Sequence, residues 1–98
     1  MDLELAARQL DSLGSPVRLR VYRTLVRAGD AGLAVGPLQE RVGIPASTLS
    51  HHLRRLLEAG LVSRERRGTT LMCRADYPTM RALVGFLMDE CCADEGAA

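Results

Sequence analysis

Three cysteines are the residues of this 98-residue sequence best suited to chemistry. Cys91 and Cys92 stand side by side in an acidic stretch near the end of the chain, and the third is Cys73. Clustered thiolates select soft, thiophilic ions, and three of them without a histidine suit a trigonal pyramidal site better than tetrahedral zinc. A lone cysteine such as Cys73 is more often a small buried hydrophobic residue. Packing explains the adjacent pair poorly, because neighbouring residues on a helix point about 100° apart and one of the two must therefore leave the core.

A second set of functional side chains lies on a predicted helix within residues 44–60. Four leucines of this helix form one apolar stripe about 100° wide, the width of a core-facing side. They are Leu49, Leu53, Leu56 and Leu57. The other side begins with hydroxyls and a histidine and continues with arginines, a pattern that suits the major groove of DNA, where small groups reach base edges and arginines hold phosphates. The predicted DNA contacts on this helix are Ser47, Thr48, Ser50, His51, Arg54 and Arg55.

Charge is segregated along the chain, although the net charge is only +1. Five arginines fall within fourteen residues, and they are Arg54, Arg55, Arg64, Arg66 and Arg67. A short acidic tail starts at about residue 89 and carries Asp89, Glu90, Asp94 and Glu95. A basic patch on a nearly neutral domain indicates a polyanionic partner.

Length and composition limit the class of protein. Ninety-eight residues predict a single domain over residues 1–98, and no run approaches the roughly 18 to 20 apolar residues of a membrane-spanning helix. The acidic, amphipathic start resembles neither a signal peptide nor a transit peptide, so a cytoplasmic location with reduced thiols is expected. No Cys-x5-Arg or glycine-rich anion loop occurs, which argues against a thiol enzyme such as an arsenate reductase.

The predicted elements run helix, helix, helix, helix, hairpin, helix. Helices are expected at residues 2–12, within 14–29, at 36–43, within 44–60 and at 78–92, with a hairpin over 61–76 that turns at Arg67-Gly68. Ser15 is expected to cap the second helix, whose buried stripe is assigned to Val17, Leu19, Val21 and Leu25. A mostly helical chain with one β-hairpin suits a winged helix-turn-helix. One or more of the wing arginines Arg64, Arg66 and Arg67 are expected to contact phosphate.

Two blocks of the sequence resemble one family. "STLSHHLRRLLEAGLVSRERRGTTLMCR" looks like the recognition helix and wing of the ArsR/SmtB family of bacterial repressors, and "DSLGSPVRLRVYRTLVRAG" resembles the opening of its members. The resemblance runs from about Leu10 to Leu87. It departs at Pro45 and Ala46, where members often have a capping serine and a glutamine, so Ser47 is expected to cap the helix instead.

The resemblance implies a homodimer that sits on a palindromic operator of double-stranded DNA and leaves it when an inducer binds. Apolar residues of the first and last helices are expected to pair across a two-fold axis, and they are Leu3, Leu10, Leu13, Val84, Leu87 and Met88. A symmetric dimer then requires half-sites roughly 34 Å apart.

Inducer sites of the family are only partly present. Ala34 and Gly36 replace the thiols of the Cys-Val-Cys site, and the last helix lacks the histidines of the zinc site. Members with a Cys-Cys pair in the last helix look like responders to trivalent arsenic or antimony. The hypothesis is therefore an arsenite, antimonite or methylarsenite site made by Cys91 and Cys92 with Cys73 of the same chain or of the partner, and no constitutive cofactor.

Two alternatives stay open. The same thiols could form a dithiol switch that senses sulfide or oxidants, although acidic neighbours raise thiol pKa values and oppose easy oxidation. The winged helix could also serve protein contacts alone, although the hydroxyl and arginine face of residues 47–55 argues against it.

Overall fold

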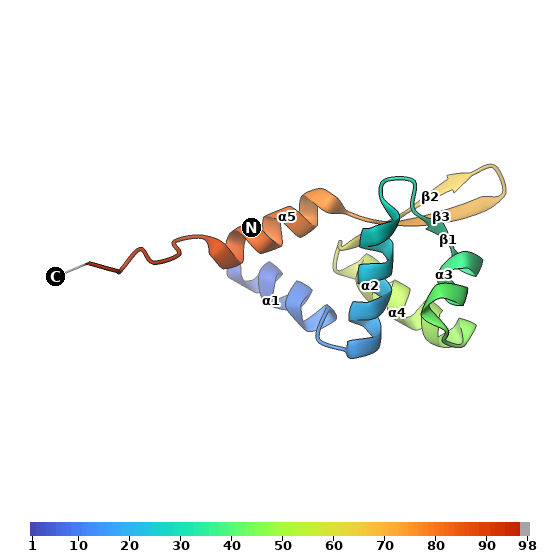
Figure 1. Ribbon diagram of the computed structural model, residues 1–98, viewed down its shortest axis with the longest axis horizontal. Helices are drawn as coiled ribbons and strands as arrows, with labels where there is room; N and C mark the ends of the chain where they lie inside the picture. The colour runs from blue at the N-terminus through green and yellow to red at the C-terminus, as the bar shows by residue number, and fades with distance from the viewer. Residues whose placement is uncertain (97–98) are drawn as a thin grey trace.

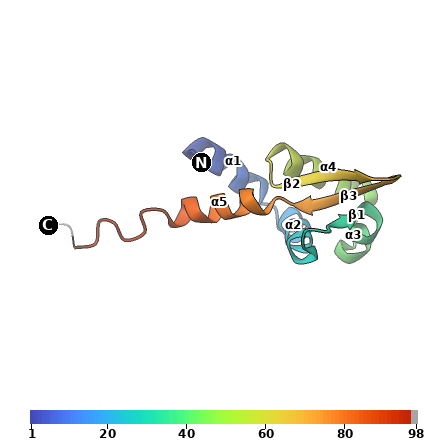
Figure 2. The same cartoon turned by 90° about the horizontal axis from the view of Figure 1, so that it is seen from above.

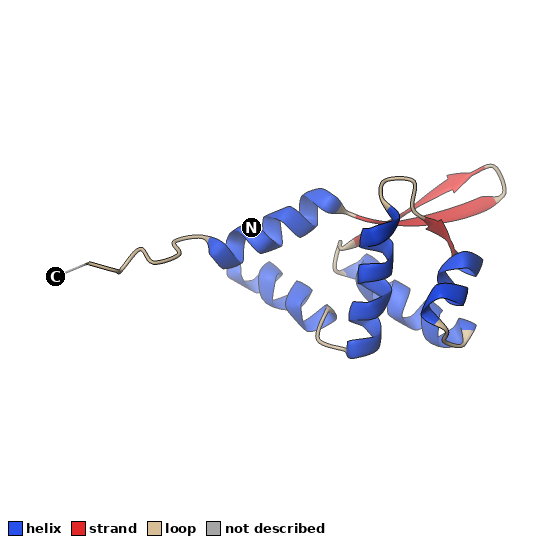
Figure 3. Cartoon of the chain, in the orientation of Figure 1, coloured by secondary structure: helices blue, strands red, loops and turns tan. Residues whose placement is uncertain are grey.

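The computed structural model describes residues 1–96, and its elements follow the predicted order with one added strand (Figure 1). Helices and strands are coloured separately in Figure 3. Their bounds are α1 (Leu3–Ser12), α2 (Pro16–Ala28), β1 (Leu33–Ala34), α3 (Val35–Val42), α4 (Ala46–Glu58), β2 (Val62–Arg67), β3 (Thr70–Ala75) and α5 (Tyr77–Met88). The expected mostly helical fold with a β-hairpin wing is confirmed.

Three helices begin at side-chain caps. Asp2 accepts a hydrogen bond from the Leu5 amide, Ser15 from Arg18 and Asp76 from Thr79, so each satisfies one free amide of a first turn. The cap at Ser15 was predicted. The cap at Asp76 was not, and it starts α5 one residue earlier than Pro78.

The expected cap at Ser47 is wrong. Helix α4 begins at Ala46, and the residue in the cap position is Pro45, whose extended backbone presents its carbonyl to the Leu49 amide at 3.0 Å. A capping side chain must precede the first helical residue, whereas Ser47 already lies in the first turn. Its hydroxyl is therefore exposed on the helix surface.

The sheet has the antiparallel order β1-β3-β2. Cys73 of β3 lies opposite Leu33 of β1 on one side and opposite Arg64 of β2 on the other. Gly32 allows β1 to approach, because its φ is +71° and an added Cβ would lie 2.3 Å from the Cys73 carbonyl oxygen. Strand β1 was not predicted, because two residues are too short to show an alternating pattern.

The core forms where α2 packs against α3, α4 and β3. Its buried leucines include three of the four stripe residues predicted for α4, Leu49, Leu53 and Leu56. The predicted stripe of α2 is partly wrong, because Leu19 is 40% exposed while Arg18 is only 7% exposed. Arg18, Val21, Tyr22 and Leu25 are the buried side chains of this helix, spaced as one helical face.

Helix α5 packs against α1 and ends at Met88, so the expected helix through Cys92 is wrong. Asp89 leaves the helical conformation, and Glu90 and Cys92 have positive φ values of 60° and 62°. Acidic side chains at a helix C-terminus oppose its dipole, which disfavours continuation through Asp89 and Glu90. Residues 89–96 instead extend away from the other elements (Figures 1 and 2).

Several large apolar side chains are exposed at the end of the molecule formed by α1 and α5. They are Leu3, Leu10, Val84, Leu87 and Met88, whereas Leu13 packs against the core. Among residues 1–96, no helix has both the length and the apolar character needed to cross a membrane.

Candidate nucleic-acid interface

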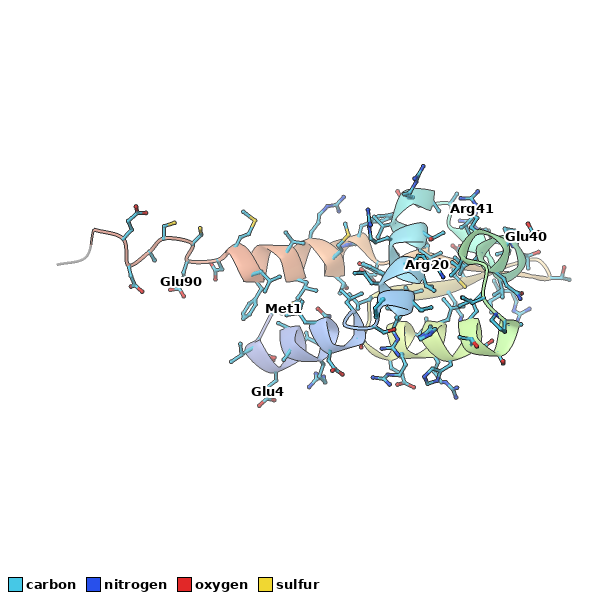
Figure 4. All side chains as sticks on the ribbon, turned by 60° about the horizontal axis from the view of Figure 1, so that its bottom comes forward. Met1, Glu4, Arg20, Glu40, Arg41 and Glu90 are labelled. Atoms are coloured by element: carbon cyan, nitrogen blue, oxygen red, sulfur yellow. The ribbon has the colours of Figure 1, made fainter. Side chains whose placement is uncertain are left out.

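The outer face of α4 carries a regular stripe of polar side chains. Ser47, Ser50, His51 and Arg54 are exposed at spacings of three, four and seven residues, which places them on one side of the helix. Thr48 flanks this stripe and is half-buried. Figure 4 shows the side chains on the outer side of α4 pointing away from the domain. Hydroxyls and an imidazole at the N-terminal half, followed by a guanidinium, are suited to base edges and a phosphate.

Arg55 occupies a different position from Arg54. It is half-buried at the edge of the stripe, where one guanidinium nitrogen lies 3.8 Å from a carboxylate oxygen of Asp11 in α1. An ion pair of this length between a half-exposed guanidinium and an exposed carboxylate contributes little to stability. Arg55 therefore remains available to a phosphate, but it lies nearer to α1 than to the centre of the polar stripe.

The three wing arginines do not share one face. Arg64 lies opposite Cys73 and Arg66 opposite Leu71, so both lie on the side of the hairpin that turns Cys73 toward the helices. Arg67 lies on the other side, where its guanidinium is 3.3 Å from Glu65. The tip of the hairpin projects beyond α3 (Figure 2). Arg64 and Arg66 are thus the wing arginines that could contact one duplex together.

A buried polar link connects α2 with α4, and sequence reasoning missed it. The Nε of Arg18 donates to Nδ1 of His52 at 3.2 Å, and another guanidinium nitrogen donates to the Ser12 carbonyl at 3.1 Å. His52 is 9% exposed, and within residues 1–96 no carboxylate forms an ion pair with Arg18. Burial, followed by the Arg18 charge, lowers the pKa of His52, so the imidazole is held neutral and accepts at Nδ1.

One signal could have revealed this link. Arg18 precedes Val21 by three residues and Leu25 by seven, so it belongs to the buried face of α2 by its spacing alone. A charged residue on a buried face requires a partner, and His52 is a buried polar residue of α4, the helix against which α2 packs. His52 therefore positions α4 from within, whereas its neighbour His51 is exposed.

The structure brings two of the three thiols together. The sulfur atoms of Cys91 and Cys92 lie 3.5 Å apart in the exposed tail, while Cys73 is fully buried in β3. Burial raises the pKa of Cys73, partly offset by Arg64, and hydrogen bonds to Cys91 and then Glu95 raise the pKa of Cys92. Across residues 1–96 the structure contains no group of three histidine, cysteine or acidic residues placed to hold a metal ion.

Comparison with known proteins identifies the family. Residues 13–65 match a family described as a helix-turn-helix domain. The nodulation protein NolR of Rhizobium meliloti is 34% identical over 88 residues, which is 90% of this chain and 70% of NolR. The homodimeric winged helix-turn-helix DNA-binding domain of Mb0332 from Mycobacterium bovis, a possible ArsR-family regulator, is 29% identical with a TM-score of 0.69, covering 91% of this chain and 82% of that one. The chain belongs to the ArsR family.

Two further relatives of this ArsR-family chain are informative. The biofilm growth-associated repressor of Xylella fastidiosa is 35% identical over 92 residues, which is 94% of this chain and 78% of the repressor. A solved structure named as a possible transcriptional regulator for arsenical resistance is 32% identical with a TM-score of 0.67, covering 83% of this chain and 80% of that one. The predictions of a winged helix-turn-helix repressor that binds DNA, and not an enzyme, are confirmed at the level of the family.

Proposed function

We propose that this chain is a homodimeric repressor that binds a palindromic operator through α4 and the wing, and that a thiol-binding inducer releases it. The observation that carries the DNA-binding part is the exposed stripe of Ser47, Ser50, His51 and Arg54 on the outer face of α4. Trivalent arsenic is the inducer that the tail thiols support best, and antimonite and methylarsenite share its chemistry.

Operator binding assigns separate roles to α4 and the wing. Ser50 and His51 reach base edges in the major groove, with Ser47 and Thr48 beside them, while Arg54 holds a phosphate. Arg64 and Arg66 add phosphate contacts from the wing, and Arg55 and Arg67 are secondary because each lies near an acid. Three principal phosphate contacts per protomer give about six per dimer, so log K should fall with log salt with a slope of about −5.

Dimerisation is supported by the apolar end of the molecule. Leu87 is 59% exposed, and Leu3, Val84 and Met88 are also exposed on the surface of α1 and α5. An exposed apolar patch of this kind is typical of an interaction surface. A second copy would cover it through a two-fold axis, as the homodimeric relative Mb0332 suggests, and would set two α4 helices one duplex turn apart.

The geometry of the thiol pair suits a pyramidal soft ion. Sulfur atoms 3.5 Å apart give an S–metal–S angle of about 100° at a metal–sulfur bond of about 2.3 Å, which is smaller than the tetrahedral angle that zinc prefers. Arsenous acid would exchange two of its three hydroxyl groups for the sulfur atoms of Cys91 and Cys92, and the two thiol protons would leave with these hydroxyl groups as two water molecules. The similarity to a possible regulator for arsenical resistance supports this inducer.

Cys73 is poorly placed to be the third ligand of the inducer. Its side chain is fully buried beside β1 and β2, and the tail extends away from the sheet (Figure 1). Ligation by Cys73 would require the helices α2 and α3 that pack on β3 to move away from it. We therefore assign the inducer to Cys91 and Cys92, with a hydroxide or a thiol of the second copy in the third position.

The alternative dithiol switch is less well supported. Consecutive Cα atoms lie about 3.8 Å apart, below the 4.4–6.8 Å usual for a disulfide, so an oxidised Cys91–Cys92 pair would be strained. Hydrogen bonding also raises the pKa of the Cys92 thiol, which disfavours its reactive thiolate. Oxidant sensing would need a disulfide between copies, and sulfide sensing would need an oxidant that removes two electrons as sulfide and one of these thiols form a persulfide.

One binding assay tests both halves of the proposal. Fluorescence anisotropy should measure binding to DNA fragments adjoining the chain's own gene, first across a salt series and then with arsenite under reducing conditions. We expect arsenite to weaken binding about 5- to 150-fold, the usual range of coupling between two sites. Cys91→Ser/Cys92→Ser should abolish the response, while Cys73→Ser is the matched control and should retain it.

The outcomes separate the alternatives. Failure to bind any promoter fragment would contradict the repressor assignment. Normal binding with a full arsenite response in the double cysteine variant would remove the tail from the inducer site. Release by mild peroxide or sulfide, but not by arsenite, would favour the dithiol switch.

A further inference from the structure

A basic groove runs along the exposed face of α2. Arg20, Arg23 and Arg27 are all exposed and line it together with Leu19, Thr24 and Pro16, enclosing about 400 Å³. Helix α2 contains no acidic residue, and in the described part of the chain none of these three arginines takes part in an ion pair. The groove therefore presents three unneutralised positive charges around one exposed leucine.

The operator-binding surface does not account for this groove. Helix α2 packs against α4 through its buried face, so its exposed face points to the opposite side of the domain (Figure 2). A duplex held on the outer face of α4 would lie across the protein from Arg20 and Arg23. A ligand of this groove would therefore be a partner other than the operator.

The C-terminal tail of this chain has the matching chemistry. Residues 89–95 contain four acids and no base, with two cysteines between them. Every residue from 89 to 96 is exposed, and the backbone hydrogen bonds within the tail are local turns, such as Cys91 to Met88 and Glu95 to Cys92. We propose that the α2 groove binds the acidic tail of a second copy of this chain, with carboxylates on the arginines and Cys91 or Cys92 against Leu19.

The direction of α5 favours the tail of another copy over the chain's own tail. Tyr77 at the start of α5 donates a hydrogen bond to the Val26 carbonyl at the end of α2, and the helix then runs about 18 Å away. The tail continues in that direction, and Figure 4 shows Glu90 well separated from Arg20 of the same chain. A return would require the chain to reverse fully after Met88.

A symmetric dimer places the groove in the path of the tail. A copy that covers the apolar end of α1 and α5 lies beyond Met88, where the tail emerges. The groove begins at Pro16, six residues after the exposed Leu10, so it starts near the α1 part of this covered surface. Residues 89–95 can span up to about 24 Å, whereas Arg20 and Arg27 are separated by about 10 Å along α2. This inference rests on the proposed dimer.

Docking of the tail would also connect the thiols with α4, the helix proposed to contact the operator. The tail would lie on α2, which packs directly against α4. Exposed ion pairs are individually weak, so the contact depends on several charges acting together, on tethering within the dimer and on low salt. An inducer that binds Cys91 and Cys92 would then alter a contact made to the helix behind α4.

Paramagnetic relaxation in mixed dimers tests the contact. One copy carries Cys91→Ser and a nitroxide on Cys92, since Cys73 is buried and protected from labelling. The other copy is ¹⁵N-labelled and carries Cys91→Ser/Cys92→Ser, so any broadening of its amides comes from the tail of its partner. We expect selective loss of intensity at residues 19–27, with recovery in 0.5 M salt.

The charge dependence decides the result. Arg20→Glu/Arg23→Glu/Arg27→Glu in the ¹⁵N copy should abolish the broadening, whereas Arg41→Glu on the exposed surface of α3 should preserve it. A dimer by light scattering with no broadening on α2 would overturn this inference and leave the proposed function intact. A monomer would overturn both. If the broadening appears only when duplex DNA is absent, and DNA binds tightly to the groove, then the ligand of the groove is nucleic acid instead of the tail.

Discussion

Replacing His52 by leucine should destabilise the fold by about 2–4 kcal/mol, although leucine is apolar and the site is buried. The substitution removes the acceptor of the Arg18 Nε hydrogen bond, and Arg18 is only 7% exposed. A hydrogen bond to a charged group contributes about 1.5–3 kcal/mol, and an uncompensated buried charge costs about 3–5 kcal/mol. The Ser12 carbonyl still accepts from Arg18, so the expected loss lies below the upper limit.

A double-mutant cycle tests the cause of this loss. Arg18→Met/His52→Leu removes both partners together, so no buried charge is left without an acceptor. We expect the double variant to be more stable than His52→Leu alone, in contrast to the additive loss of independent sites. Urea denaturation followed by circular dichroism, at one fixed protein concentration, measures each free energy of unfolding.

His51→Leu is the matched control on the neighbouring position. His51 is exposed and has no hydrogen bond to Arg18, so its loss should change stability by no more than about 0.5 kcal/mol while weakening operator binding. Equal stability of the His51→Leu and His52→Leu variants would refute the reasoning. So would a double variant whose loss equals the sum of the two single losses.

Three further predictions concern pH, the sheet and the dimer. The folded state lowers the pKa of His52, so the stability that neutral His52 contributes is complete above the ordinary histidine pKa of about 6.5 and is lost as pH falls through the folded pKa. Urea denaturation should therefore show a free energy of unfolding that falls from pH 7.5 to 5, and His52→Gln should reduce this fall. Gly32→Ala should cost more than about 2 kcal/mol because its Cβ meets the Cys73 carbonyl, whereas Gly43→Ala, with an open site and a left-handed helical backbone, should cost about 1 kcal/mol by thermal denaturation. Leu87→Glu should shift sedimentation equilibrium toward monomer, and an unchanged dimer would move the interface elsewhere.

Periodicity was sufficient to predict which face of α4 is buried and which is exposed. The leucines at positions 49, 53 and 56 repeat at helical spacing, and burial of these side chains leaves Ser50, His51 and Arg54 outside. The tendency of a lone cysteine to be a small buried residue likewise agrees with the full burial of Cys73 in β3. These features depend only on the spacing of residues within one helix or strand and on the burial of one of its faces.

Features that depend on contacts between distant segments could not be predicted in this way. Strand β1 exists because Leu33 pairs with Cys73, forty residues away, and its two residues carry no pattern of their own. The partner of Arg18 lies on another helix, so the spacing along α2 indicates burial without naming His52. The end of α5 at Met88 is a local feature that the prediction missed, because Asp89 and Glu90 oppose the helix dipole whereas the predicted helix was extended through Cys92.

The polar links between α1 and α4 provide a route by which a change at the proposed dimer interface would alter operator binding. Arg18 joins the last residue of α1, through the Ser12 carbonyl, to His52 in the middle of α4, and Gln9 of α1 donates to the Ala59 carbonyl at the end of α4. Both links are largely buried, so α1 and α4 should shift together when the α1–α5 interface changes. Arg18→Lys keeps the charge, but a single ammonium cannot reproduce the geometry of a guanidinium that bonds both groups. In a folded Arg18→Lys dimer, the fold-change in operator Kd on adding arsenite should therefore shrink toward one in the anisotropy assay. A ratio equal to that of the unsubstituted chain would show that the signal bypasses this link.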